Sequence, residues 1–116
     1  MVEFVDLYPT LADLCGLSPP ANLDGVSLRT LLDDPSGTVK DATFTTVVRG
    51  QVTGLSVRTD GHRYTEWTGG EEAVELYDHS TDPGEWYNLA DDPDSSSVRR
   101  DLAERLERFR QAVPKP

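Results

Sequence analysis

The hydrophobic positions of this chain change their period along its length, and this change predicts the order of the elements. In the first segment apolar residues recur at spacings of three and four, which predicts one face of a helix. They are Phe4, Leu7, Tyr8, Leu11, Leu14 and Cys15. Asp6 is a candidate N-cap, Pro9 falls in the first turn, and Gly16 suits the left-handed stop. So short a helix needs a larger surface to pack against.

Residues 17–40 contain clusters of turn-forming residues instead of a long periodic segment. "SPPANLDG" and "DDPSGT" are rich in proline, glycine and aspartate, a composition typical of turns. Between them lies "SLRTLL", where Ser27 is a candidate cap for a short helical turn. We therefore expect an irregular connector in this part of the chain.

From residue 42 onward the hydrophobic period becomes two, which predicts β-strands. The segments are "ATFTTVV" (42–48), "GLSVRT" (54–59), "HRYTEWT" (62–68) and, after the turn "GGEE" (69–72), "AVELYD" (73–78). Asp60-Gly61 separates the second and third, and such a two-residue loop is typical of a hairpin with positive φ at both positions. Because the strands follow one another closely, we expect them to pair in order as an antiparallel meander.

The last segment returns to a helical period. Its apolar stripe consists of Val98, Leu102, Leu106, Phe109 and Val113, with a serine of 95–97 as the cap and Pro114 as the stop. One such helix covers one face of a small sheet. The sequence therefore predicts an α+β fold: a four-stranded antiparallel sheet packed by a C-terminal helix, with a short N-terminal helix and an irregular connector. We divide the chain into residues 1–40 and 41–116.

The register of the hairpin predicts which side chains share a face of the sheet. Counting outward from the turn, Arg58 lies opposite Arg63, and Trp67 lies on the same face opposite Gly54. Two arginines opposite each other repel, so carboxylates or an anionic ligand should offset their charge. We favour carboxylates, because surface arginines usually pair locally; the alternative is a sulfated or carboxylated sugar stacked on Trp67. The core face carries Leu55, Val57 and Tyr64.

Charge and composition exclude several classes of partner. The formal net charge is −10, which argues against nucleic acid and anionic membranes. No apolar run is long enough to span a bilayer, and no charged-then-apolar leader opens the chain. Either the protein is not exported or its leader lies outside this sequence. Cys15 is the single cysteine, so we expect no internal disulfide.

The stretch "VELYDHSTDPGEWYNLADDP" (74–93) carries the candidate polar site. Its centre has the residues of a type II turn, with positive φ expected at Gly84. Oxygen-bearing side chains here could bind calcium, but their spacing does not match a twelve-residue calcium loop. Asp and Asn also bind backbone groups in tight turns. We therefore favour a structural clasp made of Asp78, Asp82, Pro83, Gly84, Glu85 and Asn88.

Several motifs in order resemble the C-terminal part of a sulfatase. They are "VDLYPTLADLCGL", "DGVSLRTLL", "SVRTDGHRYTEW" and "ELYDHSTDPGEWYNLADDP", followed by the terminal helix. The resemblance is to the iduronate-2-sulfatase-like branch of the alkaline-phosphatase-like superfamily. It implies a parent enzyme that hydrolyses sulfuric esters of a sulfated sugar, using a calcium ion and a formylglycine made from a "C/S-x-P-x-R" motif.

The same resemblance implies a role for each part of this chain. Residues 1–40 would end the catalytic domain, and residues 41–116 would form a subdomain that packs against it beside the substrate cleft. Arg63 and Trp67 are then candidate residues of the substrate rim. If the parent is similar to exported sulfatases, we expect a periplasmic or secreted protein.

The chain departs from the family pattern at the catalytic residues, and the paired aspartates that hold the metal in the family have no counterpart in it. It contains no "C/S-x-P-x-R" motif, and Cys15 is followed by "GLSP". We therefore expect neither a catalytic centre nor a cofactor in this chain, with calcium and formylglycine belonging to the catalytic domain. The expected partner is that N-terminal catalytic domain, and an exposed N-terminal helix would also favour self-association. The alternative is a free-standing module that binds an acidic sugar or calcium.

Overall fold

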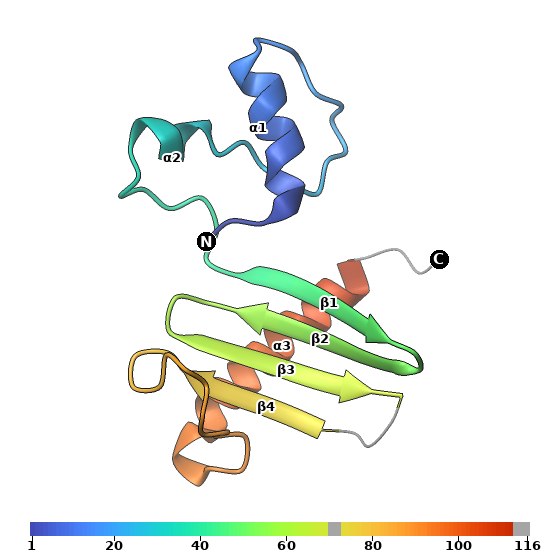
Figure 1. The fold of residues 1–116 in the computed structure, drawn as a ribbon, viewed down its shortest axis with the longest axis vertical. Coiled ribbons are helices and arrows are strands. Elements are labelled where there is room, and N and C mark those ends of the chain that lie inside the picture. The colour runs from blue at the N-terminus through green and yellow to red at the C-terminus, as the bar shows by residue number, and fades with distance from the viewer. Residues whose placement is uncertain (70–72, 113–116) are drawn as a thin grey trace. The chain divides into compact units, whose positions relative to one another are not determined.

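The computed structural model describes residues 1–69 and 73–112 (Figure 1). Two compact units divide the chain, Met1–Thr43 and Phe44–Pro116. The helices of the first unit are a 3-10 helix at Phe4–Asp6, α1 at Leu7–Leu14 and α2 at Arg29–Asp33. The second unit contains β1 at Thr43–Arg49, β2 at Val52–Arg58, β3 at His62–Thr68, β4 at Ala73–Asp78, a 3-10 helix at Pro93–Ser95 and α3 at Ser96–Ala112. None of the described helices is long and apolar enough to cross a membrane.

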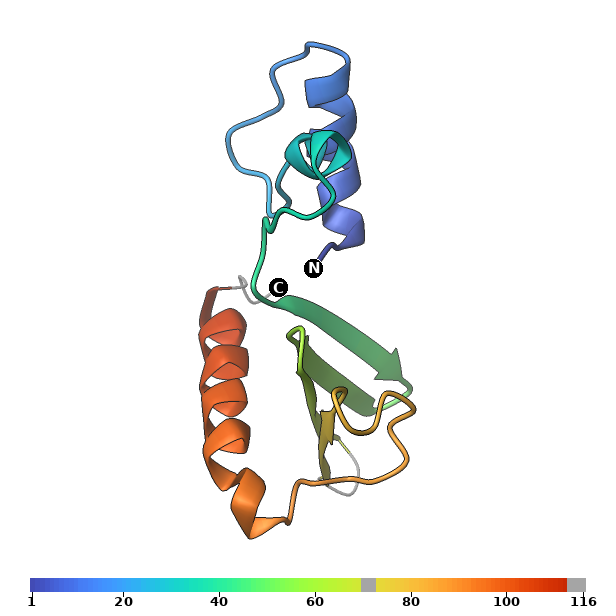
Figure 2. The same ribbon diagram turned by 90° about the vertical axis from the view of Figure 1, so that its left-hand side faces the viewer.

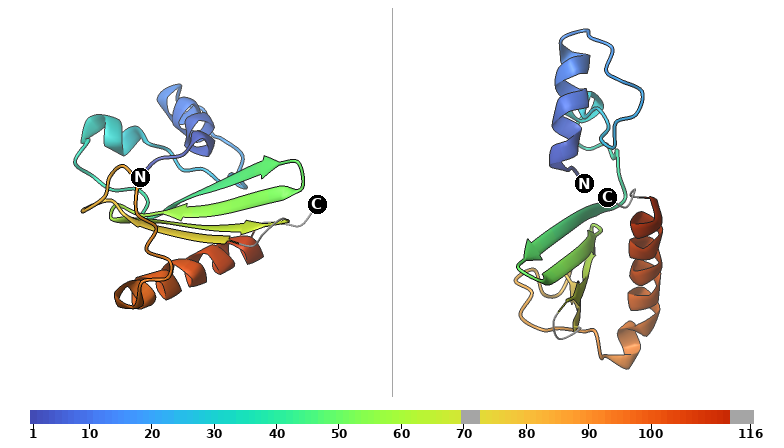
Figure 3. Two further views of the ribbon diagram at one scale, coloured as in Figure 1. Left: turned by 60° about the horizontal axis from the view of Figure 1, so that its bottom comes forward. Right: turned by 90° about the vertical axis from the view of Figure 1, so that its right-hand side faces the viewer.

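The second unit is a four-stranded sheet covered by one helix. The strand order is β1-β2-β3-β4, and β3 pairs antiparallel with both β2 and β4. The long helix α3 runs across one face of the sheet, as Figures 2 and 3 show from different sides. The predicted α+β fold, with its sequential antiparallel sheet and C-terminal helix, is confirmed.

The core lies between α3 and the facing side of the sheet. Val57, Leu76 and Leu106 are fully buried, and Tyr64 and Leu102 are nearly so. Burying each such side chain stabilises the fold by about 1.5–3 kcal/mol. The rings of Phe44 and Phe109 stack with centroids 4.2 Å apart and extend the contact toward the end of α3. The predicted apolar stripe of α3 is thus the face that packs against the sheet. Val113, Pro114 and residues 70–72 of the "GGEE" turn lie outside the described residues.

The hairpin has the predicted register but not the predicted backbone. Arg58 pairs with Arg63, and Gly54 pairs with Trp67. Positive φ is absent at Asp60-Gly61, so the expected pair of left-handed residues is wrong. Thr59 closes the loop instead: its N–H donates to the carbonyl of His62 at 2.9 Å, and its hydroxyl accepts from the His62 N–H at 3.1 Å.

Strand boundaries differ from the prediction where a glycine was read as the start of a strand. β2 begins at Val52 and includes Gly54, whereas we predicted residues 54–59. β1 is displaced by one residue from 42–48, and β3 and β4 match their predicted bounds. A Cβ built on Gly54 would lie 2.5 Å from the Trp67 ring. Gly54 therefore makes room for an aromatic ring on the neighbouring strand.

Asp6 is the N-cap residue of α1, as predicted, but its side chain organises the first unit instead of capping the helix. Its buried carboxylate makes no cap bond to α1. It accepts instead from the backbone N–H groups of Glu3 at 2.8 Å and Val26 at 3.0 Å, and from Lys40 Nζ at 2.7 Å. Burial raises the pKa of Asp6. The hydrogen bonds from Lys40 and from the backbone donors lower it by more than burial raises it, so the pKa lies below its usual value. The carboxylate is drawn to segments distant in sequence, which local spacing does not show.

In the connector of the first unit, the residue that begins the short helix also differs from the prediction. The short helix α2 is present, but its N-cap is Leu28 and not the predicted Ser27. The Ser27 hydroxyl donates to Asp13 Oδ2 at 2.6 Å and accepts from the Arg29 N–H at 3.2 Å. Ser27 therefore ties the connector to α1, while Gly16 adopts the predicted left-handed conformation with φ of 68°.

The helix α1 exposes its apolar side. Phe4 is 91% exposed and Leu11 is 60% exposed, and Leu7, Tyr8 and Leu14 are also exposed. The residues buried beneath the helix are small or polar: Asp6, Pro9, Thr10 and Ala12. The apolar stripe predicted for residues 4–15 is therefore real, but it faces away from the rest of its own unit.

We predict that Gly54→Ala destabilises the second unit by about 1–3 kcal/mol, because the new methyl group would overlap the Trp67 ring. Urea unfolding followed by tryptophan fluorescence would measure the loss. Gly61→Ala is the matched control, since a methyl group at Gly61 would meet nothing within 4 Å and the φ of this residue is not positive. Equal stability of the two variants would show that Trp67 does not need this space.

Candidate functional site

The candidate site lies on the face of the sheet opposite α3, where the loop after β4 crosses toward β3 (Figure 2). Arg63 and Trp67 lie on this face, as the register predicts. Trp67 is partly buried with its ring over Gly54, and Arg58 is exposed opposite Arg63. The structure therefore places both candidate rim residues on one side of one strand.

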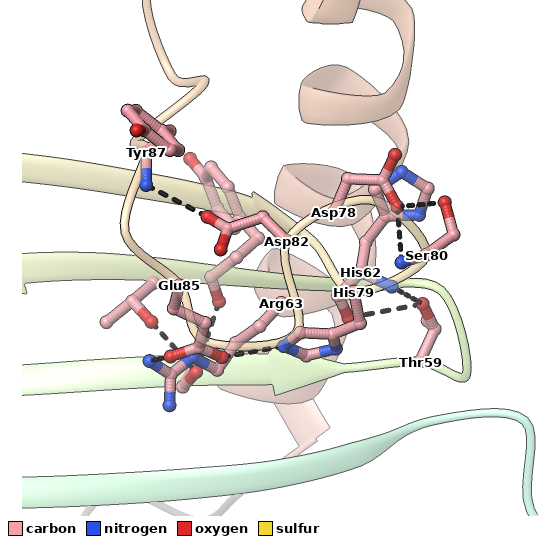
Figure 4. Close-up of polar contacts among 12 residues, drawn as sticks. Thr59, His62, Arg63, Asp78, His79, Ser80, Asp82, Glu85 and Tyr87 are labelled. Atoms are coloured by element: carbon pink, nitrogen blue, oxygen red, sulfur yellow. Dashed lines mark hydrogen bonds and ion pairs between the residues drawn. The ribbon is translucent and has the colours of Figure 1, made fainter.

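Glu85 joins the loop to the sheet through two side chains (Figure 4). Its Oε2 accepts from the Arg63 guanidinium, and its Oε1 lies 2.6 Å from His79 Nε2. The same guanidinium lies 5.6 Å from the centre of the Tyr77 ring. The carboxylate that we favoured as the local partner of Arg63 is therefore Glu85. Calcium binding was the alternative that we did not favour, and the described residues contain no group of three His, Cys, Asp or Glu side chains placed to hold a metal ion.

The backbone at Glu85 is strained. Its φ of 57° is the one positive value at a non-glycine among the described residues, and Gly84 is not positive. The predicted type II turn with positive φ at Gly84 is therefore wrong, although Glu85 N–H does bond the Asp82 carbonyl at 3.1 Å. A Cβ at Gly84 would overlap the indole nitrogen of Trp86, so a larger residue here would displace that exposed ring. Left-handed geometry costs a glutamate about 1–2 kcal/mol, which its contacts with Arg63 and His79 offset.

Two polar atoms of this cluster are buried without a partner among the described residues. They are Arg63 Nε and His79 Nδ1. The His79 side chain is only 9% exposed, whereas Arg63 is 35% exposed. A buried polar atom without a hydrogen bond costs about 1–3 kcal/mol. The cluster therefore has unused hydrogen-bonding capacity that sequence reasoning did not detect.

Asn88 binds the free edge of β4. Its Oδ1 accepts from the N–H groups of Leu76 at 2.9 Å and Ala90 at 3.0 Å, and its Nδ2 donates to the Val74 carbonyl at 3.0 Å. The Leu89 N–H then bonds the Leu76 carbonyl at 2.8 Å. One amide side chain thus replaces part of a neighbouring strand. This arrangement supports the clasp interpretation for Asn88.

Asp78 and Asp82 bond within their own loop. Asp78 Oδ1 accepts from the Ser80 hydroxyl at 2.6 Å and the Ser80 N–H at 2.8 Å, and the hydroxyl contact is the main cause that lowers the pKa of Asp78. Asp82 Oδ2 accepts from the Tyr87 N–H at 2.9 Å. Both carboxylates therefore shape the turn around Pro83.

A separate hollow lies at the N-terminal end of α3, and sequence reasoning missed it. Tyr64, Asp92, Arg99 and Arg100 are among its lining residues. The Tyr64 hydroxyl donates to Glu66 at 2.9 Å, and Arg99 donates to the Ala90 carbonyl at 2.8 Å. Burial, followed by Glu66, raises the pKa of Tyr64 to about 12. The tyrosine is therefore a neutral hydroxyl that supports packing between the sheet and α3.

Comparison with known proteins identifies relatives along nearly the whole chain. The family described as N-sulphoglucosamine sulphohydrolase, C-terminal, matches residues 1–112. A sulfatase of Formosa agariphila is 36% identical over 89 residues, which are 77% of this chain and 17% of that protein. A delta 4,5-hexuronate-2-O-sulfatase of Bacteroides thetaiotaomicron is 36% identical over 102 residues, covering 81% of this chain and 20% of the relative.

Solved structures show the same fold. The crystal structure of a putative sulfatase from Bacteroides thetaiotaomicron superimposes with a TM-score of 0.78 and 34% identity. The match covers 90% of this chain and 23% of that protein. The chain therefore spans about a fifth of the length of the relatives that it matches.

We predict that Asn88→Ala destabilises the second unit by roughly 2–3 kcal/mol, because the edge of β4 loses two hydrogen bonds and the loop at Ala90 loses one. Faster amide exchange at Leu76 and a lower urea midpoint would report the loss. Asn22→Ala is the control, since Asn22 is exposed in the first unit and its replacement should change stability by less than about 0.5 kcal/mol. Unchanged exchange at Leu76 would remove the clasp role of Asn88.

Proposed function

This chain belongs to the N-sulphoglucosamine sulphohydrolase C-terminal family and is the C-terminal portion of a sulfatase, and we propose that the whole enzyme hydrolyses a sulfated sugar. The family description names an N-sulfated sugar, and one relative is named for a 2-O-sulfated hexuronate. The chemistry that these names share is a sulfate group on a sugar ring. The iduronate-2-sulfatase-like motifs of this chain favour a sugar that also carries a carboxylate.

Within that enzyme the chain has an accessory role. Hydrolysis in this family is implied to need a formylglycine nucleophile and a calcium ion, and the sequence has no "C/S-x-P-x-R" motif from which to make the formylglycine. Both groups would therefore be held by the catalytic domain. Such groups supply an activated nucleophile and offset the charge on the transferring sulfate.

The observation that carries this role is the exposed apolar side of α1. A helix normally buries its apolar stripe and exposes its polar side, yet here Phe4 and Leu11 are exposed while Asp6 and Thr10 are buried. Contiguous apolar patches of this kind mark interaction sites. We assign residues 1–40 to the end of the catalytic domain, which would cover this stripe. A second copy of the chain is the alternative occupant.

Arg63 and Trp67 are our candidates for contact with substrate. Arg63 remains partly exposed while bound to Glu85, and the neighbouring Arg58 adds a second positive charge on the same face. A guanidinium binds sulfate or carboxylate through parallel hydrogen bonds. This pair of arginines would therefore attract an anionic group of the sugar that lies away from the reacting bond.

We predict that the 116-residue chain alone does not hydrolyse a sulfated disaccharide or an aryl sulfate, whereas the protein with its catalytic domain does. Sulfate release followed by ion chromatography measures both, and chelation of calcium should abolish the activity of the larger protein. Titration calorimetry of the chain alone with calcium and sulfated oligosaccharides should give flat traces. Turnover by the chain alone would refute the accessory role, and saturable heat would favour a free-standing binding module.

We predict that Arg63→Ala in the whole enzyme raises KM for the sulfated uronate about tenfold and changes kcat less than threefold, since one charged contact to substrate is lost. Steady-state kinetics on this substrate and on an aryl sulfate that has no carboxylate distinguish loss of the remote contact from a change in the chemical step. Glu85→Gln is the matched control, because it breaks the same ion pair but keeps the guanidinium. If the two variants raise KM equally, the pair is structural and Arg63 is not a rim residue.

A further inference from the structure

Two adjacent aromatic side chains stand out from the surface of the second unit. Trp86 is 83% exposed and Tyr87 is 75% exposed. They follow Glu85 directly in the loop between β4 and α3. Soluble domains rarely leave such large apolar rings uncovered side by side, and patches of this kind mark interaction sites.

The backbone presents this aromatic pair, Trp86 and Tyr87, in a fixed position. The Tyr87 N–H bonds Asp82 Oδ2 at 2.9 Å (Figure 4), and the Trp86 indole lies against Gly84. On one side Glu85 is held by Arg63 and His79, and on the other Asn88 is held by the edge of β4. Pre-organised side chains lose little entropy when they bind. Backbone strain is typical of functional sites, and the left-handed conformation of Glu85 beside the aromatic pair is consistent with a binding surface at this position.

The charge around the aromatic pair favours one kind of partner. Residues 74–94 contain seven acidic residues and neither lysine nor arginine; the acids are Glu75, Asp78, Asp82, Glu85, Asp91, Asp92 and Asp94. Arg63 of β3 and His79 already lie against Glu85, and the other six acids are contributed by the rest of this segment. A sulfated sugar is an anion and would be repelled by such a segment, whereas a basic protein surface would be attracted.

We propose that the aromatic pair is the contact through which the second unit docks on the sulfatase catalytic domain. This inference rests on the proposed function, which supplies that domain. A centre that binds sulfate groups must offer positive charge, so the protein around it complements an acidic loop. Buried aromatic residues at the middle of an interface, with polar residues around them, dominate its affinity. Trp86 and Tyr87 are the anchors, and the acidic residues around them set the orientation.

The test compares cysteine accessibility in the 116-residue chain and in the whole enzyme. Tyr87→Cys is made in a Cys15→Ser background and labelled with a neutral maleimide, and the modified peptide is quantified by mass spectrometry. We expect labelling of residue 87 to slow at least tenfold in the whole enzyme. Glu104→Cys is the control, because residue 104 is exposed on α3, and its labelling rate should change less than twofold.

Three outcomes would overturn the proposal. Equal labelling of residue 87 in both proteins would show that no domain covers it. If the labelling of residue 87 slows only when a sulfated oligosaccharide is added, the aromatic pair binds sugar. If the labelling of residue 87 in the 116-residue chain slows as the concentration of that chain rises, a second copy of the chain covers the aromatic pair. In the unmodified proteins, amide exchange over residues 84–90 checks the same contrast: protection in the whole enzyme supports docking, and equal exchange contradicts it.

Sulfate release by the whole enzyme is measured on the same samples. An active enzyme whose residue 87 labels freely removes this inference and leaves the proposed function intact. An enzyme that releases no sulfate from sulfated sugars or aryl sulfates removes the proposed function, and with it the identity of the partner.

Discussion

β4 is an edge strand, and the hydrogen bonds that Asn88 makes to it determine the path of the chain beyond the sheet. Unpaired strand edges expose donors and acceptors that must be satisfied. The Asn88 amide meets Leu76 N–H and the Val74 carbonyl in the positions that a fifth strand would occupy. The loop between the end of β4 and Asn88 turns tightly, and within it Glu85 adopts a left-handed conformation. The contacts of Glu85 and the presentation of Trp86 follow from that turn.

A different polar anchor organises the first unit. Lys40 bonds both Asp6 and Glu3, at 2.7 and 2.6 Å, and joins the end of the connector to the start of the helical segment. Such a buried pair contributes little net stability, but removing one partner leaves an uncompensated buried charge. The buried pair of Lys40 and Asp6 therefore determines how the connector lies on the helical segment, and it adds little to the stability of the first unit. Because this polar side of α1 is already occupied, the apolar side is the one left for another surface.

Sequence patterns predicted the sheet well because its determinants are local. Alternation over six or seven residues defines a strand, and a two-residue loop defines the register between Val57 and Tyr64. Patterns failed where a residue permits more than one geometry. Gly84 allows positive φ without requiring it, and its φ is not positive. Asp6 occupies the predicted N-cap position of α1, but its side chain bonds Lys40, which lies 34 residues away.

The site was predicted residue by residue but not as an arrangement. Arg63 and Glu85 were each singled out, yet their ion pair spans 22 residues, and no periodicity reports such a contact. Nor did the sequence indicate that His79 would share the same carboxylate, since a histidine at a strand end has many possible neighbours. Contacts between a strand and a later loop depend on how the loop folds back, which here is decided by Asn88.

The second unit separates its charges in a way that suits a subdomain beside a sulfate-binding centre. Arg49, Arg58 and Arg63 lie on the first three strands, whereas the segment after β3 up to Asp94 carries only acidic charge apart from His79 in its described part. The formal net charge of the whole chain is −10, and such charge spread evenly would repel an anionic sugar from every direction. In the docking that we propose, the acidic loop would face a basic protein surface and its charge would be neutralised there. Arg58 and Arg63 would then dominate the potential on the open face of the sheet.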